Sequence, residues 1–272
     1  MPDLERINTY MKRVAESGKK TFKPAEPVYK CGLDLGTAYI VLVVLDKDDN
    51  PVVCEEQAVD VLRDGVVVDY AGALKVVKEL KTRAEKRLGD ELVNCAIAMP
   101  AGTLSSVRTH RYVAEGAGFE VTNILDEPSA ANSIYCVSNG AVVDIGGGTT
   151  GLAVLNDGVV TEIYDEPTGG IHLTLVIAGN YHIPLPEAEK LKTDFSRHRE
   201  MLPVVKAVME KMATIVMKHI DRQATEAIYL CGGTSCFTDI ETVFENVTGI
   251  RTVKTAYPLL VTPAGIAVNC KV

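Results

Sequence analysis

The sequence lacks the long apolar runs that a membrane protein needs. No stretch of its 272 residues approaches the roughly 20 apolar residues of a membrane-spanning helix. Residues 1–30 have no apolar core of the kind found in secretory signals, so we expect no signal peptide. Hydrophobic residues make up 47% of the chain and charged residues 24%, which is ordinary for a folded globular protein.

Positive charge is also scarce. The chain has 28 lysines and arginines against 36 aspartates and glutamates, which gives a net charge of −8. A general nucleic-acid-binding protein usually presents a basic face, and attachment to acidic lipid needs one too. We therefore expect neither nucleic acid nor a membrane among the partners.

The seven cysteines lack the spacing of a disulfide framework or a standard zinc site. Their number is odd, and no two of them form a CxxC pair. Several stand inside apolar runs, where cysteine behaves as a small hydrophobic residue. We expect free thiols and a cytoplasmic location.

Two stretches of the sequence repeat one pattern. Residues 32–37 place Asp34 and Thr37 at a turn between two apolar runs, and residues 142–149 do the same with Asp144 and Thr149. Each stretch predicts a β-hairpin that is followed by a further strand. Repeats so far apart in the chain, together with its length, indicate two similar domains rather than a solenoid.

The rest of the sequence alternates predicted strands and helices. Residues 3–20 have apolar side chains at helical spacing and predict a docked or loosely ordered amphipathic helix, with a targeting or partner-binding helix as the alternative. A Pro-containing linker, 22–27, follows. Strands are expected at 51–59, 92–99, 121–125, 159–164 and 227–231, a strand pair at 61–69, a loop at 100–102, and helices at 70–88, 105–117, 126–137, 171–178, 186–195, 202–223, 238–245 and 263–268.

The second hairpin turn has the composition of a phosphate site. Asp144 ends an apolar run and is followed by three glycines and two threonines. Glycines let the backbone approach a ligand, and successive turn amides can bind an anion. An aspartate at this place can hold a hydrated cation. The first turn taken alone is compatible with an ordinary structural turn.

In their order along the chain, five motifs resemble those of the actin/Hsp70/sugar-kinase nucleotide-binding superfamily. They are the first phosphate motif at 34–37, the Hsp70-like first connecting helix at 126–131, the second phosphate motif at 144–149, the adenosine motif at 231–235 and the second connecting helix at 264–267. The resemblance covers residues 29–270. It is strongest to the small Hsp70-like proteins of ethanolamine-utilisation operons (the J proteins), which are associated with bacterial microcompartments.

The resemblance implies an α/β protein with two ribonuclease-H-like lobes, the actin-like ATPase fold, and a nucleotide cleft between them. We expect an N-terminal helix and linker at 1–27, lobe I at 28–138 completed by a C-terminal helix at 262–272, and lobe II at 139–261. The implied function is chaperone-like, assisting the assembly or maintenance of microcompartment enzymes. ATP, ADP and microcompartment enzymes or shell proteins are the expected partners, and the protein is expected in the cytoplasm, associated with microcompartments.

The expected cofactors are ATP and Mg²⁺. Three carboxylates, Asp34, Glu127 and Asp144, would face the phosphates, a grouping that makes sense only around a hydrated Mg²⁺. Asp34 and Asp144 are the expected metal-binding residues, through water. The resemblance implies that Asp144, with Glu127, orients the attacking water.

The remaining expected site residues contact the nucleotide. Gly36, Thr37, Gly146, Gly147, Gly148 and Thr149 would hold phosphate oxygens, and Gly232, Gly233 and Thr234 the nucleoside. Glu187 and Lys190 resemble the Glu-x-x-Lys pair of Hsp70 proteins, although an ordinary solvated helix face explains them equally well.

Two features of Hsp70 proteins have no counterpart in the sequence. No residue matches the catalytic lysine, for which Lys47 and Lys75 are candidates by residue type only, and we expect no peptide-binding domain. ATP binding with slow or absent hydrolysis, a weak ATPase at most, is therefore expected. An actin-like filament protein, a small-molecule kinase and a nucleotide-independent scaffold are the alternatives.

Overall fold

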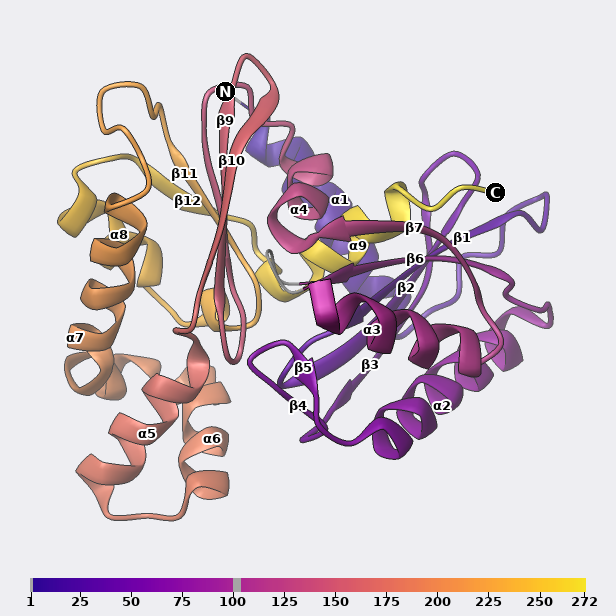
Figure 1. Ribbon diagram of the computed structural model, residues 1–272, viewed down its shortest axis with the longest axis horizontal. Helices are drawn as coiled ribbons and strands as arrows, with labels where there is room; N and C mark the ends of the chain where they lie inside the picture. Colours follow the sequence, from indigo (N-terminus) through magenta and orange to yellow (C-terminus); the bar gives the residue numbers. More distant parts are fainter. Residues whose placement is uncertain (1, 100–103) are drawn as a thin grey trace.

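The computed structural model describes residues 2–99 and 104–272, which form two five-stranded sheets with helices around them (Figure 1). The loop expected at 100–102 lies outside the described residues. The α/β class is confirmed. No helix in the described part of the chain is long and apolar enough to cross a membrane.

The two sheets have the same topology. The first has the order β3-β2-β1-β6-β7, and the second β10-β9-β8-β11-β12. In each sheet, three antiparallel strands that follow one another in the chain are joined by two parallel strands that come later. The strands are β1 (Tyr29–Leu35), β2 (Tyr39–Asp46), β3 (Pro51–Ala58), β6 (Asn94–Met99), β7 (Glu120–Asp126), β8 (Gly140–Ile145), β9 (Thr150–Asn156), β10 (Val159–Glu166), β11 (Ile228–Cys231) and β12 (Thr252–Lys254).

The repeat seen in the sequence is thus a repeat of structure. Leu35 pairs with Ile40 at the end of the β1–β2 hairpin, and Ile145 pairs with Thr150 at the end of the β8–β9 hairpin. Each turn therefore stands at the same register position in its sheet. A small extra hairpin, β4 (Leu62–Arg63) and β5 (Val66–Val67), follows the first meander.

The helices form three layers around the sheets. The outer face of the first sheet packs against α2 (Tyr70–Leu88) and α3 (Leu104–Gly116). The outer face of the second packs against α5 (Gly170–Tyr181), α7 (His198–Met217) and α8 (Ile240–Thr248), with α6 (Leu185–Thr193) beside α5. The inner faces share one apolar core with α1 (Leu4–Ser17), α4 (Glu127–Tyr135) and α9 (Val261–Val268).

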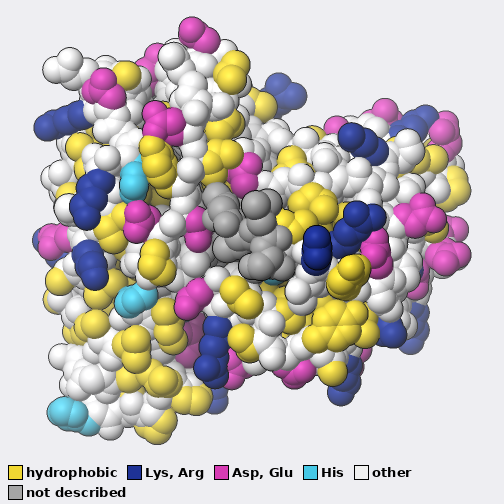
Figure 2. All heavy atoms as spheres, viewed as in Figure 1, with side chains coloured by type: hydrophobic (Ala, Val, Ile, Leu, Met, Phe, Trp, Pro, Cys, Tyr) yellow, Lys and Arg dark blue, Asp and Glu magenta, His cyan; other side chains and the backbone are white. Residues whose placement is uncertain are grey.

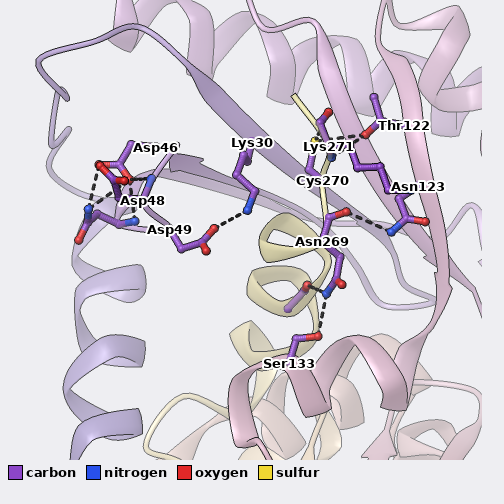
Figure 3. A network of polar contacts seen from close by, with 12 residues as sticks. Lys30, Asp46, Asp48, Asp49, Thr122, Asn123, Ser133, Asn269, Cys270 and Lys271 are labelled. Atoms are coloured by element: carbon purple, nitrogen blue, oxygen red, sulfur yellow. Dashed lines mark hydrogen bonds and ion pairs between the residues drawn. The ribbon is translucent and has the colours of Figure 1, made fainter. Parts of the chain in front are cut away.

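Helices α4 and α9 cross very closely in this shared layer. A Cβ atom on Gly265 would lie 1.9 Å from the carbonyl oxygen of Ala130, so only glycine permits this approach. At the end of α9, the Asn269 side chain donates to Ser133 Oγ at 2.7 Å, and the Asn269 carbonyl accepts from Asn123 Nδ2 at 3.1 Å (Figure 3). These bonds attach α9 to α4 and to β7.

The N-terminal helix is docked. Ile7, Met11 and Val14 lie in the shared core, and the last two are fully buried. Asn8 Oδ1 accepts from the Ala256 amide at 2.8 Å, next to β12, and Tyr10 Oη donates to the Asp49 carbonyl at 3.0 Å, between β2 and β3. Helix α1 is therefore bonded to segments that follow strands of both sheets.

The boundaries of α7 differ from the expected range of 202–223. The helix begins at His198, whose two ring nitrogens bond Thr238 and the Lys192 carbonyl, a start that apolar periodicity does not reveal. It ends at Met217, although Ile220 beyond it is also buried. The buried Ile220 continues the apolar spacing beyond the point where the helix has stopped.

Candidate functional site

A cleft of about 590 Å³ lies where the turns of the two large hairpins face one another. Its walls come from the first turn, the second turn, the start of α4, the segment after β11 and the start of α9. The lining residues are Asp34, Leu35, Gly36, Thr37, Ala38, Tyr39, Val41, Gly65, Glu127, Asp144, Gly146, Gly147, Gly148, Thr149, Gly232, Gly233, Leu259 and Thr262. The structure thus brings together the residues that the sequence predicted for the phosphate end.

The second turn is held by its carbonyl groups. The Gly146 carbonyl accepts from the Gly170 amide at 3.0 Å and from Thr234 Oγ1 at 2.7 Å, and the Gly147 carbonyl accepts from the Ile171 amide at 2.8 Å. No acceptor among the described residues receives the amide hydrogens of Gly147 or Gly148. Exposed turn amides of this kind form an anion site.

The first turn, between β1 and β2, also has free amides in the described structure, and the β4–β5 turn lies against it. The amides of Gly36 and Thr37 also lack an acceptor within the described part of the chain. The β4–β5 turn lies over both loops, because the Gly65 amide approaches Thr37 Oγ1 at 3.4 Å and a Cβ on Gly148 would lie 2.7 Å from Asp64 Oδ1. One small hairpin therefore contacts the turns of both large hairpins.

Three carboxylates, those of Asp34, Glu127 and Asp144, line the cleft. Burial, then the charge of Asp144, raises the pKa of Asp34 to about 7. Burial, followed by the charges of Asp144 and Asp34, raises the pKa of Glu127 well above its ordinary value. Burial also raises the pKa of Asp144, and a hydrogen bond donated by the Thr262 hydroxyl opposes that rise. Three ionised carboxylates at this place would carry more negative charge than their surroundings compensate.

The donor set suits a hydrated hard cation. No lysine or arginine is among the described residues that line this part of the cleft. No three of the His, Cys, Asp and Glu side chains described converge closely enough to ligate one ion directly. Carboxylate oxygens that surround an ion at a distance fit Mg²⁺, which keeps several of its waters in proteins.

Neither lysine candidate reaches the cleft. Lys47 pairs with Glu26 at 2.7 Å, and both side chains are exposed. Lys75 lies on α2 with its side chain 78% exposed. No lysine is among the described residues that line the first pocket.

A fourth acid near the site, Asp165 on β10, was missed by the sequence reasoning. The Thr149 side chain hydrogen-bonds its carboxylate, and burial raises its pKa to about 7. The sequence offers little signal for it, because Asp165 stands near the end of an edge strand of mixed polar and apolar residues.

A second pocket, of about 730 Å³, continues the cleft away from the carboxylates. It shares Ala38, Tyr39, Gly147, Gly233 and Leu259 with the first. Its own walls are mostly apolar and aromatic, and the remaining lining residues are Leu173, Glu189, Lys192, Thr193, Phe195, His198, Thr234, Cys236 and Phe237. A pocket with apolar walls and few polar groups suits a flat organic ring.

The Glu-x-x-Lys pair at this pocket is not the expected one. Glu187 and Lys190 are exposed and do not line it, whereas Glu189 and Lys192 do. Helix α6 contains both pairs, and two residues of helix turn a side chain to nearly the opposite face. The expectation for Glu187 and Lys190 is corrected to Glu189 and Lys192.

The corrected pair is held in place by α5. Glu189 and Lys192 lie 2.7 Å apart, and Thr174 donates to Glu189 Oε2 at 2.5 Å. Lys192 also donates to Thr174 Oγ1 at 3.0 Å and approaches the Gly170 carbonyl at 3.3 Å. Since Gly170 in turn bonds the second phosphate turn, the two pockets share one hydrogen-bonded frame.

Gly232, which follows β11, lies against the Asp144 carboxylate. Gly232 has φ +86°, and a Cβ there would lie 2.2 Å from Asp144 Oδ1. A side chain would displace the central carboxylate, so this position requires glycine. Thr234, expected at the nucleoside, lines the second pocket, but its hydroxyl donates to the Gly146 carbonyl.

Comparisons with known proteins agree with this geometry. Models of two families match, "MreB/Mbl protein" over residues 54–196 and "Cell division protein FtsA" over 141–268. The ethanolamine utilization protein EutJ of Salmonella typhimurium is 42% identical over 87% of this chain and 84% of its own. The structure of EutJ from Carboxydothermus hydrogenoformans is 44% identical, with a TM-score of 0.91 over 97% of this chain and 98% of its own.

A more distant structure shares the fold alone. MreB5 of Spiroplasma citri bound to AMPPNP is 19% identical, with a TM-score of 0.71 over 89% of this chain and 96% of its own. The resemblance to the actin/Hsp70/sugar-kinase superfamily and the two-lobed actin-like fold are thereby confirmed. The identity and coverage show that the chain belongs to the EutJ family of ethanolamine utilization proteins.

Proposed function

We propose that this protein is an ATP-binding switch of ethanolamine utilisation that holds ATP with a hydrated Mg²⁺ and hydrolyses it slowly or not at all. The observation that carries the proposal is that two turns face one another across three carboxylates, and that the amides of Gly36–Thr37 and Gly147–Gly148 have no acceptor among the described residues. In the fold neighbour MreB5 of Spiroplasma citri, AMPPNP is bound. The triphosphate would lie between the two turns and the nucleoside in the adjoining pocket.

Each phosphate-end residue has a role in this proposal. Asp34 and Asp144 would hold the ion through its waters, and the turn amides would receive phosphate oxygens. Mg²⁺, when bound, would compensate the charges of the carboxylates and the triphosphate together. Asp144 and Glu127 would orient a water molecule, because phosphoryl transfer depends mainly on positioning and charge compensation.

Slow turnover follows from the charges at the cleft. Phosphoryl transfer is usually assisted by a lysine or arginine that stabilises charge on the transferred group. None lines the phosphate end within the described residues, and Lys192, at the nucleoside pocket, is engaged by Glu189. The protein is therefore better suited to holding ATP than to cleaving it.

The output of the switch would be closure of the two lobes. The turns come from different sheets, and a nucleotide that contacts both would favour the closed arrangement. Such a conformational change could serve a chaperone-like role in the assembly or maintenance of microcompartment enzymes or shell proteins. The proposed location is the cytoplasm, with association to microcompartments.

An actin-like filament is the second candidate, and a surface feature favours it. Apolar side chains gather on the corner of the molecule formed by α5 and α6, at the lower left of Figure 2. Ile171, Leu175 and Val176 on α5 are 39%, 48% and 37% exposed. Exposed apolar faces often mark protein contacts. Sedimentation with ATP and Mg²⁺ separates the candidates, because only the filament would pellet.

Calorimetry with ATP tests the proposal directly. Wild-type protein should bind ATP more tightly with Mg²⁺ than with EDTA. Asp144→Ala should lose most of this gain, whereas Lys190→Ala, on the exposed face of α6, should bind as the wild type does. Absence of binding heat at millimolar ATP with Mg²⁺ would instead favour a nucleotide-independent scaffold.

A further inference from the structure

Asp165 lies where a fourth carboxylate can act on the phosphate site. It pairs with Gly151 across the β9–β10 ladder, at the end nearest the second turn. A Cβ on Gly151 would lie 3.9 Å from Asp165 Oδ1 and 3.2 Å from Pro128 Cδ. The missing side chain at Gly151 thus leaves Asp165 close to the start of α4, beside Glu127.

The hydrogen bonding of Asp165 is incomplete. Thr149, the last residue of the second turn, bonds its carboxylate through the side chain. Its Oδ1 atom is buried and has no hydrogen-bond partner in the described structure. A buried acceptor without a donor is unfavourable, and such atoms often take an ordered water or a ligand.

The charges around Asp165 are of one sign. Asp144, Glu166 and Asp64 all act on its carboxylate, and Asp165 in turn acts on Glu127. Glu166 is itself bonded to His219 Nε2 at 2.8 Å, so this neighbouring acid has a partner, whereas Asp165 Oδ1 has none among the described residues. A cation with bound waters would supply both the charge and the donors.

We propose that Asp165 is a positioning residue of the ATP·Mg²⁺ site, which fixes the Thr149 hydroxyl and accepts hydrogen bonds from water molecules of the bound ion. This inference rests on the proposed function. Asp34 and Asp144 line the cleft, whereas Asp165 is not among its lining residues and lies next to Gly151, beyond the second turn. Outer partners of this kind orient the groups that hold a metal and affect its affinity.

An isosteric substitution separates charge from hydrogen bonding. Asp165→Asn removes the charge but keeps an oxygen that can accept from Thr149. The matched control is Glu162→Gln, the same change on an exposed side chain of the same strand. Calorimetric titration with ATP is performed for each protein in EDTA and in excess Mg²⁺, and thermal unfolding without ligand is recorded.

We expect Asp165→Asn to affect ATP affinity differently in EDTA and in Mg²⁺. In EDTA, Asp165→Asn should bind ATP at least as tightly as the wild type, because a charge that repels the triphosphate has gone. The factor by which Mg²⁺ increases ATP affinity over that in EDTA should be about 10-fold to 100-fold smaller in Asp165→Asn than in the wild type. Glu162→Gln should retain the full gain.

Three outcomes would overturn the inference. An unchanged Mg²⁺ gain in Asp165→Asn would show that Asp165 does not act on the ion. Equal losses of ATP affinity in EDTA and Mg²⁺, with a lowered melting temperature, would show a purely structural role. If the wild type binds ATP in neither condition, the proposed function fails as well, which distinguishes that case from the first two.

Discussion

The Thr262 hydroxyl, at the start of α9, donates a hydrogen bond to the Asp144 carboxylate, at the end of β8. Both side chains are buried, with 2% and 5% of their surfaces exposed. Helix α9 also packs against α4 and β1. The central acid of the second sheet is thus bonded to a helix that is packed on the first, so a change at Asp144 can be transmitted to both halves of the protein.

Thr262→Val is expected to destabilise the protein by about 1–3 kcal/mol, because it leaves a buried carboxylate without its donor. The same change should raise the pKa of Asp144 further, since this hydrogen bond opposes the effect of burial. Urea unfolding of the ligand-free protein measures the loss. Thr262→Ser is the control because it keeps the hydroxyl, and equal stability of the two variants would show that the bond contributes nothing.

Asp34 predicts a specific pH dependence of stability. Its pKa is raised from 3.8 to about 7 in the folded protein, first by burial and then by Asp144. Between these values, the folded protein keeps a proton that the unfolded chain has released, so the stability from protonated Asp34 is lost as the pH rises from about 4 to about 7. Asp34→Asn removes this contribution.

Melting temperatures in EDTA, recorded from pH 5 to pH 8, test whether stability falls as the pH rises. The wild type should lose stability relative to Asp34→Asn as the pH rises, and Mg²⁺ with ATP should reduce the loss by compensating the charge. His198 has a pKa lowered mainly by burial and acts in the opposite direction, but it is common to both proteins. Parallel curves for the two proteins would contradict the raised pKa of Asp34.

The hairpins, the helices and the phosphate end of the site could be predicted from the sequence because their signals are local. Helix α2 has its expected bounds, since Asp69 caps its start and Gly89, with φ +80°, ends it. Apolar runs that stop at Asp34 and Asp144 mark the two strands whose turns form the cleft.

The parts that could not be predicted depend on packing between distant elements. Helix α6 contains two Glu-x-x-Lys pairs, and only its contact with α5 decides that Glu189 and Lys192 face the pocket. Asp165 stands in an edge strand of mixed polar and apolar residues, and it is partly buried because the start of α4 approaches Gly151. No pattern within either segment contains that information.

Lys192→Ala should weaken ATP binding, whereas Lys190→Ala should not. Lys192 lines the nucleoside pocket and holds Glu189, Thr174 and the Gly170 carbonyl, so its removal affects both the pocket and the frame of the second turn. Loss of hydrogen bonds from a charged group suggests a cost of about 1.5–3 kcal/mol, or roughly 10-fold to 100-fold in affinity. Titration of both variants with ATP and with adenosine measures this loss of affinity. Equal affinities of Lys192→Ala and Lys190→Ala would show that Lys192 has no special role in ATP binding.

Met11→Ala is expected to destabilise the protein by about 2–5 kcal/mol with little effect on ATP affinity. Met11 is fully buried in the core that the two sheets share with α1, and truncating a buried methionine leaves a cavity. Met11 is not among the residues that line either pocket. Lys12→Ala, on the exposed side of the same helix, is the control and should unfold as the wild type does. Urea unfolding combined with ATP titration separates the two effects. If Met11→Ala instead retained full stability, α1 would be a loosely held leader rather than part of the shared core.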